Sequence, residues 1–261
     1  MIIALLTDFG LSDWYAGAVK GVILGLNPAA AIVDITHSVP PQNIPAASFA
    51  LLAAREAFPA GTIFCVIVDP GVGTARRIVC AKSRGRLYLA PDNGVLTEVV
   101  AEDGLEAAVS VEEASLFLQP TSATFHGRDK FAPVAAKLSL GLEIDCLGPR
   151  LERIKTVDMP APVLGKESAE IPVRWIDAFG NLITACTEEM LRSLRASWGE
   201  VIADLGSGVR IPIVETYGVG APGEPLCIIG SSRRLEVSVR EGSAADRFGL
   251  VIGDMVTLRK P

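Results

Sequence analysis

Carboxylate and imidazole side chains follow predicted strands at separate places along the sequence. Asp8 comes directly after the apolar run of residues 2–6, and Asp69 ends the β-branched run of residues 62–68. His126 lies in the segment TFHGRD, ahead of a predicted helix. Ligands of open α/β sheets bind beyond the carboxyl ends of the strands. We therefore expect these side chains to gather at one candidate catalytic site.

Other polar side chains follow strands in the same way, and each also has a structural interpretation. Asp34 and His37 flank the end of a second strand, and Asp92 follows a later one. Aspartate before proline or glycine is commonly a turn residue, which would account for Asp69 in VDPGVG. Asp129 can serve as the N-cap of the helix that follows TFHGRD.

Common catalytic motifs are missing from the sequence. The glycines of GVGTARR fit neither the dinucleotide-binding nor the P-loop spacing. There is no G-x-S-x-G elbow, C-x-x-C pair or H-E-x-x-H helix. A metal-dependent hydrolase stays open as an alternative without a supporting motif, its candidate ligands being Asp8, Asp69, Asp92 and His126.

The first half of the chain alternates between strand and helix patterns, which predicts a largely parallel sheet covered on both faces. The predicted strands are residues 2–6, 31–35, 62–68, 77–82 and 86–89, and the predicted helices are residues 14–26, 44–58 and 129–140.

A proline-containing stretch, residues 148–168, is predicted to be a linker. The short strands expected after it are residues 171–176, 182–187, 200–204, 210–214, 226–229, 235–239 and 255–258, with helices only at 188–196 and 244–248. We therefore predict an α/β domain over residues 1–155 and a smaller, barrel-like all-β domain over residues 168–261.

Composition narrows the possible partners and the compartment. The 261 residues carry a formal net charge of −6, which argues against nucleic acids and anionic membranes as partners. No apolar stretch is long enough to form a transmembrane helix. The five cysteines are odd in number and widely spaced, which favours free thiols and a cytoplasmic protein.

Several motifs in a fixed order resemble the S-adenosyl-L-methionine (SAM) hydroxide adenosyltransferases, or SAM hydrolases, which are relatives of the fluorinase and chlorinase. The matching segments are LLTDFGLSDWYAGAVKG, IVDITHSVPPQNI, VIVDPGVGTARR, APDNGVL, TFHGRDKFAPVAA, WIDAFGNLITA and GSSRRLEVSVREGSAA. They cover essentially the whole chain. The resemblance implies an N-terminal α/β domain, a C-terminal β domain and a homotrimer, with each active site lying between one subunit's N-terminal domain and its neighbour's C-terminal domain.

The resemblance also implies a water-handling trio of Asp69, Arg76 and His126. The halogenating relatives carry tyrosine in place of the aspartate and other residues in place of His-Gly, so the resemblance disfavours halide transfer. Either Asp69 or His126 can accept a water proton, and Arg76 can favour hydroxide character.

Substrate contacts follow from the same resemblance. Asp8 matches the residue that binds the ribose hydroxyls, and Asp177 matches a carboxylate that holds the methionine ammonium group. The other implied contacts are Phe179 with an aromatic role, Asn181 with the adenine, Ser231 near the methionine carboxylate, and Tyr15 and Gln42 at the pocket wall. Arg233 and Arg234 depart from the family pattern, which puts the contacts near Ser232 in doubt.

The expected reaction is attack of water on the ribose C5′ of SAM, which gives adenosine and L-methionine without a cofactor. The sulfonium is a good leaving group, so no general acid is needed on that side. Two alternatives remain beside the metal-dependent hydrolase: a halide adenosyltransferase, and a non-catalytic protein that binds SAM or adenosine.

Overall fold

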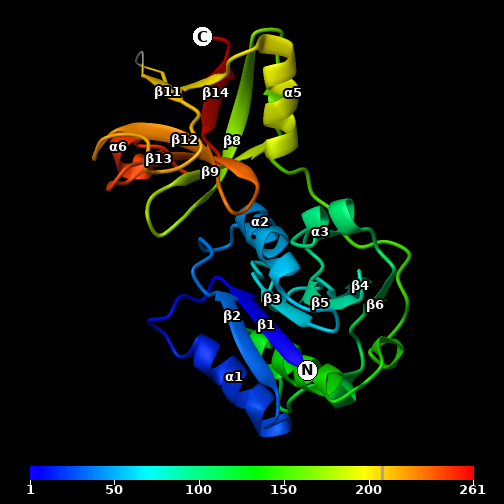
Figure 1. The fold of residues 1–261 in the computed structure, drawn as a ribbon. Helices are drawn as coiled ribbons and strands as arrows, with labels where there is room; N and C mark the ends of the chain where they lie inside the picture. Colours follow the sequence, from blue (N-terminus) through cyan, green and yellow to red (C-terminus); the bar gives the residue numbers. More distant parts are fainter. Residues whose placement is uncertain (207–208) are drawn as a thin grey trace. The chain divides into compact units, whose positions relative to one another are not determined.

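The computed structural model describes residues 1–206 and 209–261. The chain divides into two compact units, Met1–Asp158 and Met159–Pro261 (Figure 1). The first is an α/β unit built on a mainly parallel sheet, and the second is a nearly closed antiparallel sheet. The predicted fold class is confirmed.

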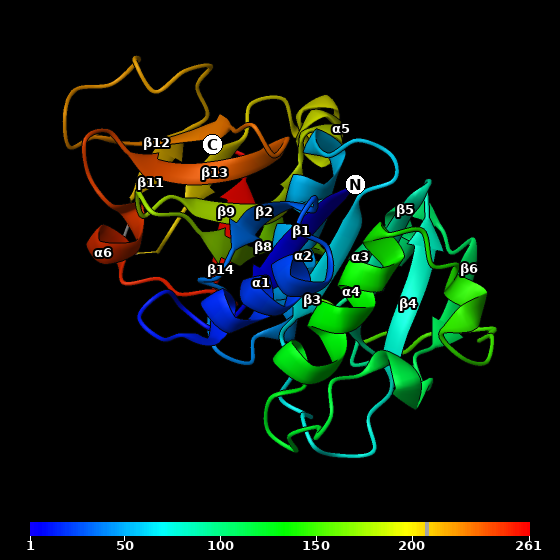
Figure 2. The same cartoon turned by 90° about the horizontal axis from the view of Figure 1, so that it is seen from below.

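In the first unit the strands run in the order β2-β1-β3-β5-β4-β6. Neighbours among the first four strands are parallel, whereas β4 pairs antiparallel with both β5 and β6. Figure 2 shows β4 and β6 toward one edge of this sheet. The elements are β1 Ile2–Thr7, α1 Tyr15–Leu26, β2 Ala31–Thr36, α2 Ile44–Ala54, η1 Arg55–Ala57, β3 Ile63–Ile67, β4 Ile78–Ser83, β5 Arg86–Pro91, α3 Thr97–Asp103, β6 Ala107–Ser110, η2 Ala114–Leu116, η3 Gly127–Phe131, α4 Ala132–Ser139 and η4 Ile144–Cys146.

The central strands of the first unit are buried on both faces. Every residue of β3 and nearly every residue of β1 is buried, as expected for parallel strands between two helical layers. Helices α1 and α4 contact each other on one face of the sheet, and α2 and α3 contact each other on the opposite face (Figure 1). Burial on both faces explains why the sequences of these strands are continuous runs of apolar residues.

Three features of this unit differ from the sequence-based predictions. Helix α3 and strand β6 had not been predicted. The helix predicted over residues 129–140 is two elements, the π-helical turn η3 followed by α4. Asp129 is therefore not an N-cap, because it lies inside η3 and is buried.

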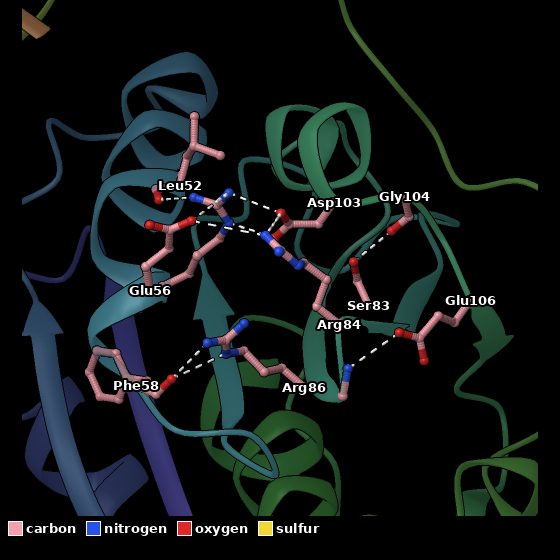
Figure 3. A network of polar contacts seen from close by, with 11 residues as sticks. Leu52, Glu56, Phe58, Ser83, Arg84, Arg86, Asp103, Gly104 and Glu106 are labelled. Carbon is pink, nitrogen blue, oxygen red and sulfur yellow. Dashed lines mark hydrogen bonds and ion pairs between the residues drawn. The ribbon is translucent and has the colours of Figure 1, made fainter. Parts of the chain in front are cut away.

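A buried ion pair ties η1, α3 and the β4–β5 turn together at the end of the sheet opposite the carboxyl ends of the parallel strands (Figure 3). Arg55 donates through Nε to Asp103 Oδ2 at 2.6 Å and through Nη2 to Oδ1 at 3.0 Å. Arg84 Nη1 donates to the same carboxylate at 3.1 Å. The Asp103 side chain is 0% exposed, so this pair is a structural tie of the fold.

In the second unit seven strands follow the order β11-β10-β14-β8-β9-β13-β12, and β7 pairs with β8. A parallel bridge between Ile213 and Cys227 joins the two ends of this order, so that the sheet nearly closes on itself. The elements are β7 Val163–Leu164, β8 Ser168–Ile176, β9 Leu182–Thr187, α5 Glu188–Trp198, β10 Ile202–Asp204, β11 Arg210–Pro212, β12 Pro225–Ile229, β13 Arg234–Val239, α6 Ala244–Phe248 and β14 Met255–Arg259.

Residues 151–162, inside the predicted linker, contain no helix or strand, and the division between the two units falls among them. Within the described parts of the chain, no helix combines the length and apolar character needed to span a bilayer.

Candidate active site

The strand order of the first unit creates a switch point between β1 and β3. From β1 the chain continues to β2 on one side and then crosses to β3 on the other. Loops that leave two such strands diverge, and the crevice between them is where α/β sheets bind ligands. Asp8 follows β1 and Asp69 follows β3, so the topology explains why both reach the same place.

A cavity of about 240 Å³ occupies this switch point. Asp8 and Asp69 line it together with His126, so the structure brings these three predicted residues together. Its remaining lining residues are Phe9, Gln42, Ile67, Pro70, Val72, Thr124, Phe125 and Gly127.

Arg76 links Asp69 and His126 through hydrogen bonds. Its Nε donates to Asp69 Oδ1 at 2.8 Å and Oδ2 at 2.9 Å, and its Nη2 also donates to Oδ2. The same Nη2 contacts His126 Nδ1 at 2.9 Å. The Asp69 and Arg76 side chains are 6% and 11% exposed, so this trio is largely shielded from bulk solvent.

The contact with Arg76 determines the tautomer of His126. A guanidinium has only donors, so Nδ1 must accept, and the proton of the neutral ring lies on Nε2. Burial and the nearby cations Lys130 and Arg76 lower the pKa of His126, while Asp69 and Asp129 oppose that shift. His126 is therefore neutral at pH 7, with an N–H donor at Nε2.

The loop from Asp69 to Arg76 is shaped by tight turns. The Val72 N–H donates to the Asp69 carbonyl at 3.2 Å, and the Thr74 hydroxyl donates to the Gly71 carbonyl at 2.7 Å. Gly73 has φ +78°, and a Cβ at this position would lie 2.5 Å from the Ala123 carbonyl oxygen. Only glycine permits this close approach, which holds the Asp69 loop against the segment that leads to His126.

The π-helical turn η3 begins immediately after His126 and is anchored by Asp129. This buried carboxylate accepts hydrogen bonds from the Ser122 N–H at 2.8 Å and from Arg128 Nε at 2.6 Å. The Leu118 N–H donates to the Asp129 carbonyl at 2.8 Å. Asp129 thus fixes the loop before His126. Single π-helical turns are often found at functional sites.

The remaining residues predicted in this unit lie around the same cavity. Asp8 Oδ2 accepts from the Gln42 N–H at 2.8 Å. Tyr15 does not line the cavity, but its ring packs 5.8 Å from Phe9 and 5.1 Å from Phe125, which do. Tyr15 therefore supports the cavity wall.

Asp92 is held away from this cavity. Its carboxylate accepts from Arg77 Nη2 at 2.6 Å and from the Lys155 backbone N–H at 2.6 Å. Asp92 is thus a structural residue that attaches the segment after β6 to the sheet. In residues 1–206 and 209–261, no cluster of histidine, cysteine and carboxylate side chains is arranged to hold a metal ion.

The second unit contains a larger cavity, of about 1110 Å³. It brings together the other four predicted contacts, Asp177, Phe179, Asn181 and Ser231. Asp177 Oδ1 accepts from the backbone N–H groups of Phe179 and Asn181, both at 2.9 Å, so Asp177 also shapes its own turn. The Phe179 ring is left 78% exposed.

Glu236 is a cavity residue that the sequence reasoning missed. It lies on β13, is 5% exposed, and accepts from the Tyr217 hydroxyl at 2.7 Å. Burial raises the pKa of Glu236, and the charge of Asp177 raises it further, whereas the Tyr217 hydrogen bond opposes the shift. The alternation of RLEVSV places Glu236 on the face opposite the core residues Leu235 and Val237, so the sequence pattern alone does not indicate that this carboxylate lines a cavity.

The two arginines that depart from the family pattern do not line this cavity. Arg233 pairs with Glu188 at 3.2 Å, and Arg234 Nη1 donates to the Ala185 carbonyl at 3.1 Å. Ser231 and Ser232 therefore still line the cavity despite the two arginines that follow them.

Two domain models cover most of the chain. The SAM hydroxide adenosyltransferase N-terminal domain matches residues 3–148, and the corresponding C-terminal domain matches residues 171–257. The chain belongs to the SAM hydroxide adenosyltransferase family. The resemblance in the sequence motifs is thereby confirmed.

Individual proteins are similar to this chain over nearly its full length. An (R)-S-adenosyl-L-methionine hydrolase from Thermus thermophilus is 40% identical over 260 residues, with 97% of each chain covered. A crystal structure of an uncharacterized conserved protein from Thermotoga maritima superposes with a TM-score of 0.92 at 37% identity, covering 99% of this chain and 100% of the other. A fluorinase from an Actinoplanes species is more distant, at 27% identity over 290 residues.

Proposed function

We propose that this protein hydrolyses S-adenosyl-L-methionine to adenosine and L-methionine, with Asp69, Arg76 and His126 positioning and activating the water. The observation that carries the proposal is the hydrogen-bonded trio, of which Asp69 and His126 line the switch-point cavity while Arg76 joins the two. The name of the 40% identical Thermus relative supports the same reaction.

The reaction requires one new bond and one broken bond. The water oxygen attacks the ribose C5′ in line with the C5′–S bond, and the electron pair of that bond returns to sulfur, which becomes the neutral thioether of methionine. One water proton must leave. Holding the water in line supplies much of the acceleration, up to roughly 7–11 kcal/mol in the most favourable intramolecular cases.

The hydrogen-bond pattern of the trio supports Asp69 as the proton acceptor. His126 Nδ1 is occupied by Arg76 and Nε2 carries the ring proton, so the neutral imidazole can donate to the water oxygen but has no free acceptor. A carboxylate has about four lone-pair sites, so Asp69 can accept from water while it holds Arg76. The proton then passes from Asp69 to solvent.

The two cavities support a site shared between subunits. The switch-point cavity has a volume of about 240 Å³, which is below the range of about 300–1,000 Å³ usual for ligand pockets. The other proposed contacts, including Asp177 and Ser231, line a separate cavity in the second unit. We infer a homotrimer in which the second unit of a neighbouring subunit contributes the adenine and methionine contacts, and Asp8 binds the ribose hydroxyls.

Three finer points extend this proposal. The Thermus relative is named for the R form of SAM, and we propose the same sulfonium epimer as the substrate here. The five cysteines are free, which supports a reducing compartment such as the cytoplasm. The net charge of −6 supports a protein without nucleic-acid or membrane partners.

Incubation of pure protein with each SAM epimer, followed by chromatography, tests the reaction. Adenosine and methionine should form from the R epimer, and turnover in ¹⁸O-labelled water should label the adenosine 5′-oxygen. Tight SAM binding without adenosine would instead indicate a binding protein. A 5′-halo-adenosine formed with chloride or fluoride would indicate halide transfer, and loss of activity with a chelator would indicate a metal enzyme.

A further inference from the structure

Arg76 lines a second cavity of the first unit. It has a volume of about 300 Å³. The residues that line it are Ala75, Arg76, Arg77, Ile78, Ser110, Val111, Glu112, Phe117 and Lys130. Of these only Arg76 belongs to the trio, and none lines the switch-point cavity.

Two arginines at this cavity have unused hydrogen-bond donors. Arg76 employs Nε and Nη2 toward Asp69 and His126, and Arg77 employs Nε and Nη2 toward Asp92. Within the described chain, neither Nη1 group makes a hydrogen bond. Both guanidinium groups can therefore bind a further acceptor without giving up the partners they already have.

Lys130 brings a third cation to the same cavity. Its Nζ lies 5.1 Å from the centre of the Phe117 ring, and it has no ion-pair partner in residues 1–206 and 209–261. Burial and the charge of Arg76 lower the pKa of Lys130. The crowding of these cations is unfavourable, and an anion between them would relieve it. Glu112 is the one carboxylate of the lining, and its residue is exposed to solvent.

Ser110 gives an independent indication that a polar ligand belongs here. The residue is 1% exposed, and its buried Oγ has no hydrogen-bond partner among the described residues. Buried hydroxyl groups in native proteins are almost always hydrogen-bonded, so an orphaned one needs an explanation. An acceptor bound in the adjoining cavity would satisfy it.

We propose that this cavity binds a small tetrahedral oxyanion of the phosphate or sulfate class. Such an ion has several acceptor oxygens at fixed angles, which lets it accept from Arg76, Lys130 and Ser110 at once. A monatomic halide offers one centre and matches such a set of donors poorly. This binding is independent of the proposed hydrolysis.

The bound oxyanion would act on the trio through charge, and this consequence rests on the proposed function. Arg76 and Lys130 are the cations that lower the pKa of His126, opposed by Asp69 and Asp129, with Asp8 lining the same cavity as the imidazole. Partial neutralisation of the two cations raises the pKa of His126. The fall in the rate of SAM hydrolysis on the acidic side of the pH–rate profile should then occur at higher pH.

Isothermal titration calorimetry of the full chain with inorganic phosphate tests the binding. Lys130→Gln should weaken phosphate binding about tenfold or more, because a charged donor is lost, and Ser110→Ala about three- to tenfold. Lys82→Gln is the matched control, since this half-exposed lysine pairs with Glu106 outside the cavity. Binding that is undetectable in the wild type, or equally strong in all three variants, would overturn the proposal.

NMR titration of the His126 imidazole then reports the coupling without any need for turnover. At matched ionic strength, phosphate should raise the His126 pKa in the wild type and leave it unchanged in Lys130→Gln, whereas chloride should have no comparable effect. An equal shift with chloride would mean simple screening and would refute a specific site. Phosphate binding and the pKa shift in a protein that does not hydrolyse SAM would contradict the proposed function alone.

Discussion

Replacement of Arg76 by lysine separates the geometry of the trio from its charge. The guanidinium holds both oxygens of Asp69 and donates to His126 Nδ1 at 2.9 Å. Lysine keeps the positive charge, but a single ammonium cannot reproduce this planar fork. The variant should therefore leave Asp69 and His126 in place but poorly aligned. Without the Arg76 contact at Nδ1, the ring proton of His126 is no longer confined to Nε2.

The size of the effect follows from the contacts that are lost. Hydrogen bonds that involve a charged group are worth about 1.5–3 kcal/mol each, and the variant loses about two of them. Water and the lysine itself replace part of this, so we expect a net loss of about 3–4 kcal/mol at the transition state. That corresponds to a fall in kcat of about 10²- to 10³-fold. KM should change little, because the trio contacts water rather than the bulk of the substrate.

Steady-state SAM hydrolysis, measured as adenosine formed, gives the comparison, and a thermal melt checks that each variant folds. Arg150→Lys is a matched control, because Arg150 forms the same kind of paired contact with Asp145 at 2.9 and 2.6 Å but is 76% exposed. A kcat for Arg76→Lys close to wild type, or an equal fall for Arg150→Lys, would refute the role given to Arg76.

Three further results are expected. The pKa of His126 is lowered from 6.5, and we propose that the neutral ring is the active form, so kcat should be constant near pH 7 and fall only below pH 6.5. A fall in kcat that begins above pH 7 in the pH–rate profile would contradict this. Asp103→Asn leaves the buried Arg55 without its partner carboxylate and should cost about 3–5 kcal/mol of unfolding free energy in urea, whereas Asp145→Asn, at a 54% exposed side chain, should leave the unfolding free energy almost unchanged. Phe179→Ala should raise KM for SAM with an unchanged melting temperature, because this ring is 78% exposed; an unchanged KM would remove it from the substrate contacts.

The arrangement of strands and of their terminal carboxylates could be predicted because burial dictates it. A run such as residues 62–68 has to be an interior strand, and parallel strands bring Asp8 and Asp69 to one edge. Helix α3 and strand β6 were missed because their short segments, Thr97–Asp103 and Ala107–Ser110, carry too few residues to establish a period. Tertiary contacts rather than local sequence decide such elements.

The hydrogen-bond partners of the side chains could not be predicted from the sequence, for a different reason. Asp129 looked like a helix cap, but its carboxylate turns inward to hold the Ser122 N–H, a choice that depends on a loop seven residues earlier. The tautomer of His126 depends on Arg76, which is fifty residues away in the chain. Such contacts depend on how the loops pack. A sequence motif identifies the residues involved, but it does not determine how their side chains are oriented.

The charge of the trio connects its geometry with the choice of nucleophile. Asp69 contributes one negative charge, Arg76 one positive charge, and His126 is neutral at pH 7 because its pKa is lowered. The group as a whole is therefore close to neutral while it presents a carboxylate acceptor beside an Nε2–H donor. Water, which is both donor and acceptor, satisfies that pair. A halide offers no proton to the Asp69 carboxylate and is repelled by its charge at short range, so the three side chains that we propose to activate water also disfavour a halide as the nucleophile.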